Sequence, residues 1–160
     1  SRPRASSCKF HLPKAAKRPG LTQALGIGMT SAAFDASVVS GHDPDEALLF
    51  IGFSDDPIQP SRYLLLQRSL ELDDQDRSLG HDTYHVEWCG QDQSFYGGIE
   101  EFVLNSAGAI IRFTPEAAVA LSGLTAVTLA LDLSAEEFAA LSRDLETLFA
   151  GSGCLIRANA

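Results

Sequence analysis

The final third of the chain limits the possible folds most, because a strand pattern is followed directly by a helix pattern. Residues 125–133 alternate between apolar and other side chains, which is typical of a strand with one buried face. Ser134 and Glu137 then have the spacing of a helix capping box. A helix covering a sheet is therefore predicted, because its apolar stripe needs a surface to bury it. The stripe consists of Phe138, Leu141, Leu145 and Leu148.

Several upstream segments have strand patterns separated by turn residues. Residues 62–70 are partly apolar on both faces, as expected of a central strand. Thr114 and Pro115 predict the start of a short helix that ends near Leu121. The expected fold is α+β, with a mainly antiparallel β-sheet of about six to seven strands, a short helix and a C-terminal amphipathic helix. The strands are expected at residues 34–40, 46–53, 62–70, 82–88, 95–104, 109–114 and 125–133.

Two segments between or within these strands have an unusual composition. Gly97 and Gly98 fall inside the expected strand 95–104, which indicates a bulge or a close approach of two backbones. Residues 72–80 contain three aspartates and are expected to form an acidic loop. This loop is either a solvated turn or a contact patch for a basic partner, and the sequence leaves both interpretations open.

Charge is divided unevenly along the chain. The first twenty residues carry six of the 12 Lys and Arg residues and no acid, a charge of +6, whereas the remainder carries the other six and all 21 acids, a charge of −15. Residues 1–28 are therefore expected to be a basic N-terminal arm, a tag or an upstream extension, and residues 29–160 a single α+β domain. Because Met29 is the only methionine, a native start near it is a further hypothesis. The acidic body argues against non-specific nucleic-acid binding and permits a basic partner.

The cysteine content favours a cytoplasmic protein. Cys8, Cys89 and Cys154 are odd in number and widely spaced, which does not indicate a disulfide framework and favours a reducing compartment. No apolar run reaches the ~18 residues that span a bilayer, so no membrane association is expected.

The densest group of potential metal ligands is His81, His85, Glu87 and Cys89. On an extended strand His81 and His85 would lie ~13 Å apart, and only His85 and Glu87 are near neighbours. A solvated strand face is therefore favoured over a metal site. No serine lies in a G-x-S-x-G elbow, and no glycine pair continues into a phosphate-binding motif, so neither catalysis nor a cofactor is expected. The alternatives are a metal-dependent enzyme that uses His85 and Glu87, or a regulatory module whose basic arm binds nucleic acid.

Several segments carry a family resemblance. They are RYLLLQRSLE (62–71), the acidic loop, DTY (82–84), YGGI (96–99) and RFTPEAA (112–118), in that order. Together they resemble the immunity protein 10 family of bacterial polymorphic-toxin systems, over roughly residues 29–150. The resemblance implies a protein that binds and neutralises a toxin made by the same or kindred cells.

These observations predict an immunity protein that occludes its toxin without catalysis. The expected partner is a cognate protein toxin, and a basic toxin would associate faster with this acidic body. Nucleic acid is not an expected partner, and the oligomeric state is left open. The expected toxin contacts are polar or amphipathic residues in one sequence neighbourhood: Asp73, Asp74, Asp76, Asp82, Glu87 and Tyr96.

Overall fold

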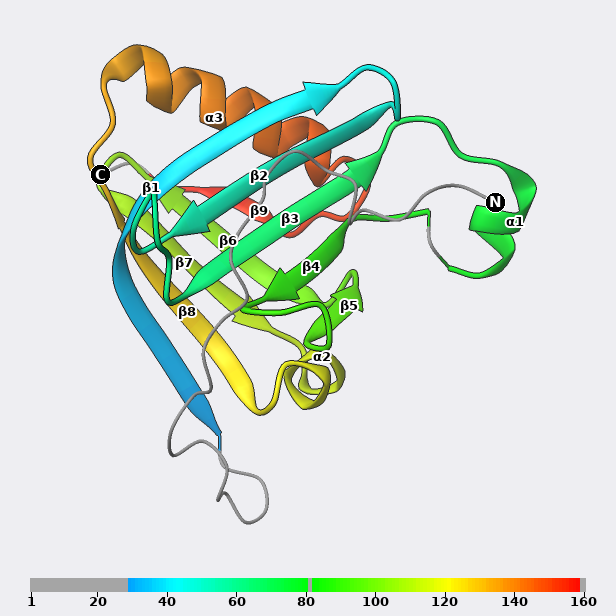
Figure 1. The fold of residues 1–160 in the computed structure, drawn as a ribbon, viewed down its shortest axis with the longest axis horizontal. Helices are drawn as coiled ribbons and strands as arrows, with labels where there is room; N and C mark the ends of the chain where they lie inside the picture. The colour runs from blue at the N-terminus through cyan, green and yellow to red at the C-terminus, as the bar shows by residue number, and fades with distance from the viewer. Residues whose placement is uncertain (1–28, 81, 159–160) are drawn as a thin grey trace.

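A computed structural model describes residues 29–80 and 82–158 (Figure 1). Within these ranges the chain forms nine strands and three helices. No helix in them is long and apolar enough to cross a membrane. The strands are β1 (Thr30–Asp43), β2 (Leu48–Ser54), β3 (Tyr63–Ser69), β4 (His85–Trp88), β5 (Ser94–Tyr96), β6 (Ile99–Asn105), β7 (Gly108–Phe113), β8 (Leu124–Leu131) and β9 (Leu155–Arg157). The helices are α1 (Asp74–Ser78), α2 (Pro115–Ala120) and α3 (Ala135–Leu148).

All nine strands belong to one curled sheet with the order β5-β4-β3-β2-β1-β8-β7-β6-β9. The long strand β1 joins its two halves (Figure 1). Residues 37–43 of β1 pair antiparallel with β2, and residues 30–36 pair parallel with β8. One half of the sheet is therefore built from β2–β5 and the other from β6–β9, with β1 shared between them.

The predicted α+β class is confirmed, but the predicted strand count is too low and the sheet is mixed, not purely antiparallel. Two of the eight strand pairings are parallel, β1 with β8 and β6 with β9. Parallel neighbours require long connections, and such pairings leave no signal in local periodicity. The three residues of β9 are too few to show an alternating pattern.

The expected strand 95–104 is two strands, because the glycine pair turns the chain between β5 and β6. Gly97 and Gly98 have φ values of +72° and +88°, in the region that favours glycine. A Cβ atom on Gly98 would lie 2.6 Å from Cβ of Ala117 in α2. The glycine at position 98 therefore makes room for side chains, Ala117 and the Phe95 ring, where a bulge or a close approach of two backbones was expected.

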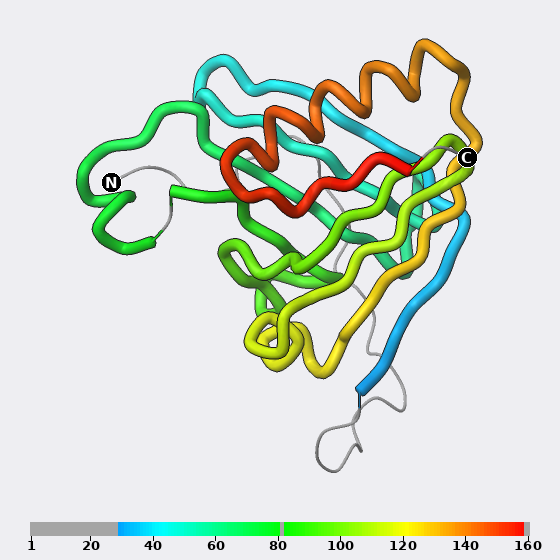
Figure 2. Tube along the Cα trace, turned by 180° about the vertical axis from the view of Figure 1, so that it is seen from behind, coloured from blue at the N-terminus to red at the C-terminus, as the bar shows by residue number. Residues whose placement is uncertain are grey.

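Both predicted helices are confirmed, together with the residues that cap them. The Thr114 hydroxyl accepts a hydrogen bond from the Ala117 amide at the start of α2. Ser134 and Glu137 form the reciprocal capping box of α3. This helix packs on β2 and β3 and lies along the upper side of the sheet in Figure 2. Three apolar stripe residues face the sheet and are buried: Leu141, Leu145 and Leu148.

The inner faces of the two half-sheets share one hydrophobic core. Phe53 of β2 and Phe102 of β6 approach to 6.3 Å between ring centroids, which joins the halves across the curl. Phe149, after α3, packs on Phe102 at 5.3 Å and edge-on against Tyr84 at 4.9 Å. Two cysteines, Cys89 and Cys154, are buried, and the third, Cys8, lies outside the described residues.

Candidate partner-binding surface

Strand register defines an outer face of β2–β5, which points away from the core. Leu66 of β3 belongs to the core, so its neighbour Gln67 projects from the outer face. Gln67 lies opposite His85, and His85 lies opposite Tyr96. Residues directly opposite one another in antiparallel strands share a face, and Glu87 follows His85 by two positions. Two of the predicted contact residues, Glu87 and Tyr96, therefore lie on the same face.

Glu87 is held in a buried pair with Tyr63 of the neighbouring strand. The Tyr63 hydroxyl donates a hydrogen bond of 2.6 Å to Glu87 Oε2, and each residue is 7% exposed. Burial, together with this acidic neighbour, raises the pKa of Tyr63 well above its ordinary value. The expectation of a solvated strand face is therefore wrong at Glu87. The sequence could not reveal this burial, because Tyr63 lies 24 residues away along the chain.

The four potential metal ligands noted in the sequence do not form a cluster among the described residues. No cluster of three or more His, Cys, Asp or Glu side chains suited to a metal ion occurs among residues 29–80 and 82–158. Glu87 is bonded to Tyr63, and Cys89 faces the backbone of Tyr63, with its sulfur 3.4 Å from the Tyr63 amide nitrogen. His81 lies outside the described residues. The remaining pair of His85 and Glu87 contributes two potential ligands, fewer than the three or four of a zinc site.

The outer face also carries an exposed aromatic ring, Tyr96, and a buried side-chain amide, Gln67. Tyr96 is 41% exposed and packs against His85, with 4.7 Å between ring centroids. Gln67 is 2% exposed, and within the described part of the chain neither its amide nitrogen nor its amide oxygen has a hydrogen-bond partner. Tyrosine is enriched at binding hot spots, so of these residues Tyr96 is best suited to contact a partner.

The acidic loop contains a helix that the sequence analysis missed. Asp73 caps α1 by accepting a hydrogen bond of 2.7 Å from the Asp76 amide, and the Asp76 carboxylate accepts one from the Asp73 amide. Asp74 is fully exposed beside Arg77. A capping box with Asp in place of Ser and Glu is the signal that could have revealed this helix.

Five of the six predicted contact residues therefore form two groups, and Asp82 lies between them in the sequence. Asp73, Asp74 and Asp76 lie together in and beside α1, which projects from the connection between β3 and β4 (Figure 1). Asp82 is exposed and precedes β4 by three residues. Glu87 and Tyr96 form the second group, on the outer face.

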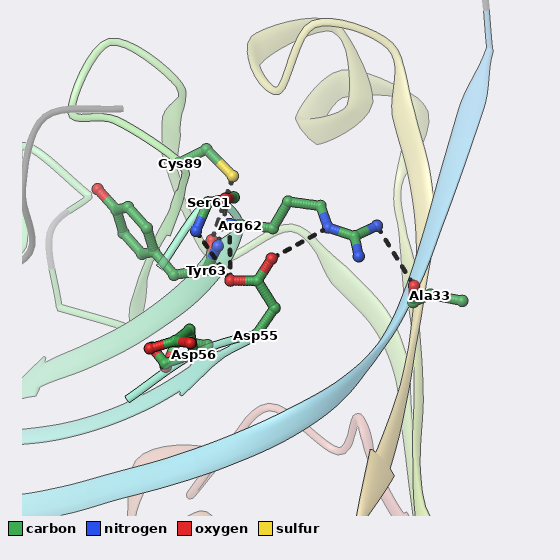
Figure 3. Close-up of polar contacts among 8 residues, drawn as sticks. Ala33, Asp55, Asp56, Ser61, Arg62, Tyr63 and Cys89 are labelled. Atoms are coloured by element: carbon green, nitrogen blue, oxygen red, sulfur yellow. Dashed lines mark hydrogen bonds and ion pairs between the residues drawn. The ribbon is translucent and has the colours of Figure 1, made fainter. Parts of the chain in front are cut away.

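The connection between β2 and β3, residues 55–62, is extensively hydrogen-bonded. Asp55 Oδ1 accepts bonds from the amides of Ser61 and Arg62, at 2.8 and 3.2 Å. The Arg62 guanidinium contacts Asp55 and donates to the carbonyl of Ala33 in β1 (Figure 3). It also lies 5.0 Å from the Phe34 ring centroid. The loop is thus fastened to β1 across the sheet, by contacts between distant residues that sequence periodicity does not report.

Negative charge is concentrated in the half of the molecule that carries these features. Residues 29–98 hold 13 acids against three arginines, a net charge of −10, and residues 99–160 hold eight acids against three arginines, a net charge of −5. The three arginines of the first half are all engaged. Arg62 contacts Asp55, Arg77 contacts Asp74, and Arg68 donates to the carbonyls of Leu148 and Ala150. Residues 29–98 are therefore called the acidic half of the chain below.

Comparison with known proteins gives one result that bears on this surface. A family model described as Immunity protein 10 matches residues 35–139, a span from β1 into α3. No curated protein and no solved structure matches the chain. The matched span contains all of the predicted contact residues and most of the acidic half.

Proposed function

The chain belongs to the immunity protein 10 family, and from this we propose that it binds a cognate toxin protein and neutralises it by covering the toxin's active surface. The family match over residues 35–139 is the observation that carries this proposal. Such an inhibitor needs a rigid scaffold and a complementary face, and it needs no catalytic residues or cofactor. We place its action in the cytoplasm of the producing cell.

The contact surface that we propose is centred on the acidic half of the sheet. Asp73, Asp74, Asp76 and Asp82 form its charged part, and the exposed ring of Tyr96 adds an aromatic contact. Glu87 has an indirect part in this proposal, because its buried carboxylate is bonded to Tyr63 and stabilises the outer face. A net charge of −10 over residues 29–98 favours a basic toxin surface and fast association.

The first step of the test is to identify the toxin gene that we expect beside this one, because its toxin domain is the binding probe. The wild-type protein should form a stable complex with that domain and abolish its toxicity when both are produced in one cell. Absence of both complex and protection would remove the proposed function.

Charge reversal then tests the surface. Asp74→Lys with Asp82→Lys should slow association by about tenfold or more at low salt and weaken its salt dependence. Asp73 and Asp76 are left in place because they cap α1. The matched control is Glu100→Lys with Asp132→Lys, two exposed acids of the other half. Equal association rates for the two double variants would reject the acidic patch as the contact.

A further inference from the structure

Ile58 is the most exposed large apolar side chain among the described residues of the acidic half. It is 80% exposed in the connection between β2 and β3. A single exposed aliphatic residue is common on protein surfaces and by itself indicates nothing. The loop that carries Ile58 is unusual, because its backbone is fixed on both sides of this residue.

The Asp56 carboxylate holds the backbone around Ile58. One oxygen, Oδ1, accepts hydrogen bonds of 2.8 Å from the Ile58 amide and 2.9 Å from the Gln59 amide. These bonds lower the pKa of Asp56, so the carboxylate stays ionised beside Ile58. The Ser54 hydroxyl donates to the Asp56 carbonyl at 3.1 Å. Pro57 and Pro60 restrict the backbone further.

The base of the loop is closed separately. The Asp55 amide donates to the Arg62 carbonyl at 3.1 Å, and the Asp55 carboxylate accepts from the amides of Ser61 and Arg62 (Figure 3). Arg62 reaches the Ala33 carbonyl at 3.3 Å. A loop held in this way loses little conformational entropy when a partner binds, and that preorganisation favours high affinity.

From this arrangement we propose that residues 55–62 form a preformed binding loop that inserts Ile58 into an apolar pocket on the toxin, with Lys or Arg side chains at the pocket rim. The pocket follows from the exposed aliphatic side chain, and the basic rim follows from the ionised Asp56 beside it and the net charge of −10 over residues 29–98. This inference rests on the proposed function and specifies which kind of toxin surface is recognised.

The loop and the acidic α1 segment can belong to one interface. They lie at opposite ends of β3, whose seven residues span about 20 Å. An interface of ordinary size buries about 800 Å² on each partner, which corresponds to a patch roughly 30 Å across. In this arrangement Ile58 contributes the apolar anchor, and α1 contributes the electrostatic attraction.

The experiment measures binding of the same purified toxin domain to four forms of the full chain, the wild type and three single variants. Ile58→Ala should weaken binding by about 30-fold or more, chiefly through faster dissociation, as expected of an anchor residue. Val119→Ala is the matched control, because Val119 is 81% exposed on α2, and it should change binding by less than about twofold. Asp56→Ala should also weaken binding, and it should accelerate hydrogen exchange at the amides of Ile58 and Gln59.

The outcomes separate the two proposals. If the wild-type chain does not bind the toxin domain, the proposed function fails and the loop inference fails with it. If the wild-type chain binds while Ile58→Ala and Val119→Ala bind equally well, the loop inference alone is overturned. Because Ile58 is exposed, its truncation leaves the core intact, and an unchanged unfolding midpoint will verify this.

Discussion

Replacing Tyr63 by phenylalanine should lower the free energy of unfolding by about 2–3 kcal/mol. Phenylalanine keeps the ring and most of its buried area but removes the hydroxyl, which donates a hydrogen bond of 2.6 Å to Glu87 Oε2. Both residues are 7% exposed, so the carboxylate that remains cannot recover this bond from bulk water without local opening. Hydrogen bonds to charged groups contribute about 1.5–3 kcal/mol, and a buried acceptor left without its donor carries a desolvation penalty of similar size.

A double substitution tests whether the loss of stability comes from leaving the Glu87 carboxylate buried without its donor. When both partners of a buried polar pair become apolar, the change is much smaller than when one is removed. The double variant Tyr63→Phe with Glu87→Met should therefore lie within about 1 kcal/mol of the wild type. Tyr96→Phe is the control, because this ring is 41% exposed and its change should stay within about 0.5 kcal/mol.

Urea unfolding followed by Trp88 fluorescence measures these differences as shifts of the midpoint at constant slope. The reasoning requires Tyr63→Phe to be clearly less stable than both Tyr96→Phe and the double variant. Equal midpoints for Tyr63→Phe and Tyr96→Phe would show that the Tyr63–Glu87 bond contributes nothing to stability.

Three further predictions concern the same scaffold. Burial raises the pKa of Tyr63 and of Tyr84, so the native state keeps both protons at a pH where the unfolded chain releases them. The free energy of unfolding should therefore be constant up to about pH 10 and then fall by about 1.4 kcal/mol per pH unit for each tyrosine. Urea unfolding between about pH 8 and 11 will test this. Gln67→Met should raise the free energy of unfolding by about 1–2 kcal/mol, because a buried amide without partners in the described chain is replaced by an apolar side chain of similar size, and a loss of stability would contradict this. Gly108→Ala should destabilise by about 3 kcal/mol or more, because the new Cβ would lie 2.1 Å from the Leu129 carbonyl oxygen. Gly41→Ala, whose Cβ would meet only the movable Phe50 ring at 3.1 Å, should have a smaller effect on the thermal midpoint.

Local signals in the sequence predicted the helices at both ends of β8 accurately. The cap at Thr114 and the capping box of Ser134 and Glu137 act over three residues, so a short window contains all the information. The apolar stripe of α3 is visible for the same reason. The parallel neighbours of β1 and β6 are set by residues far away in the chain, and no local window contains them.

The sequence showed which residue types the candidate surface contains, but it could not show how they are arranged in space. A strand at residues 82–88 was predicted, and its Val86 and Trp88 lie in the core, but the sequence could not show that the opposite face is also covered at Glu87. The aspartates at positions 73–76 were visible, whereas the helix that they cap was not. The order of residues 55–62 depends on Arg62 reaching Ala33, a contact that only the folded sheet creates.

The position of β1 between the two half-sheets has a consequence for when the domain can fold. Its first residues pair with β8, where the Thr30 amide donates to the Gly123 carbonyl at 2.9 Å, 93 positions further along the chain. During synthesis β2–β5 can pair with β1 early, but the other edge of β1 keeps unpaired backbone groups until β8 has left the ribosome. Such long-range closure slows folding and leaves a strand edge open to association in the meantime. Under the function proposed above, a partly synthesised chain would not yet protect the cell, so this protein would have to be made before the toxin.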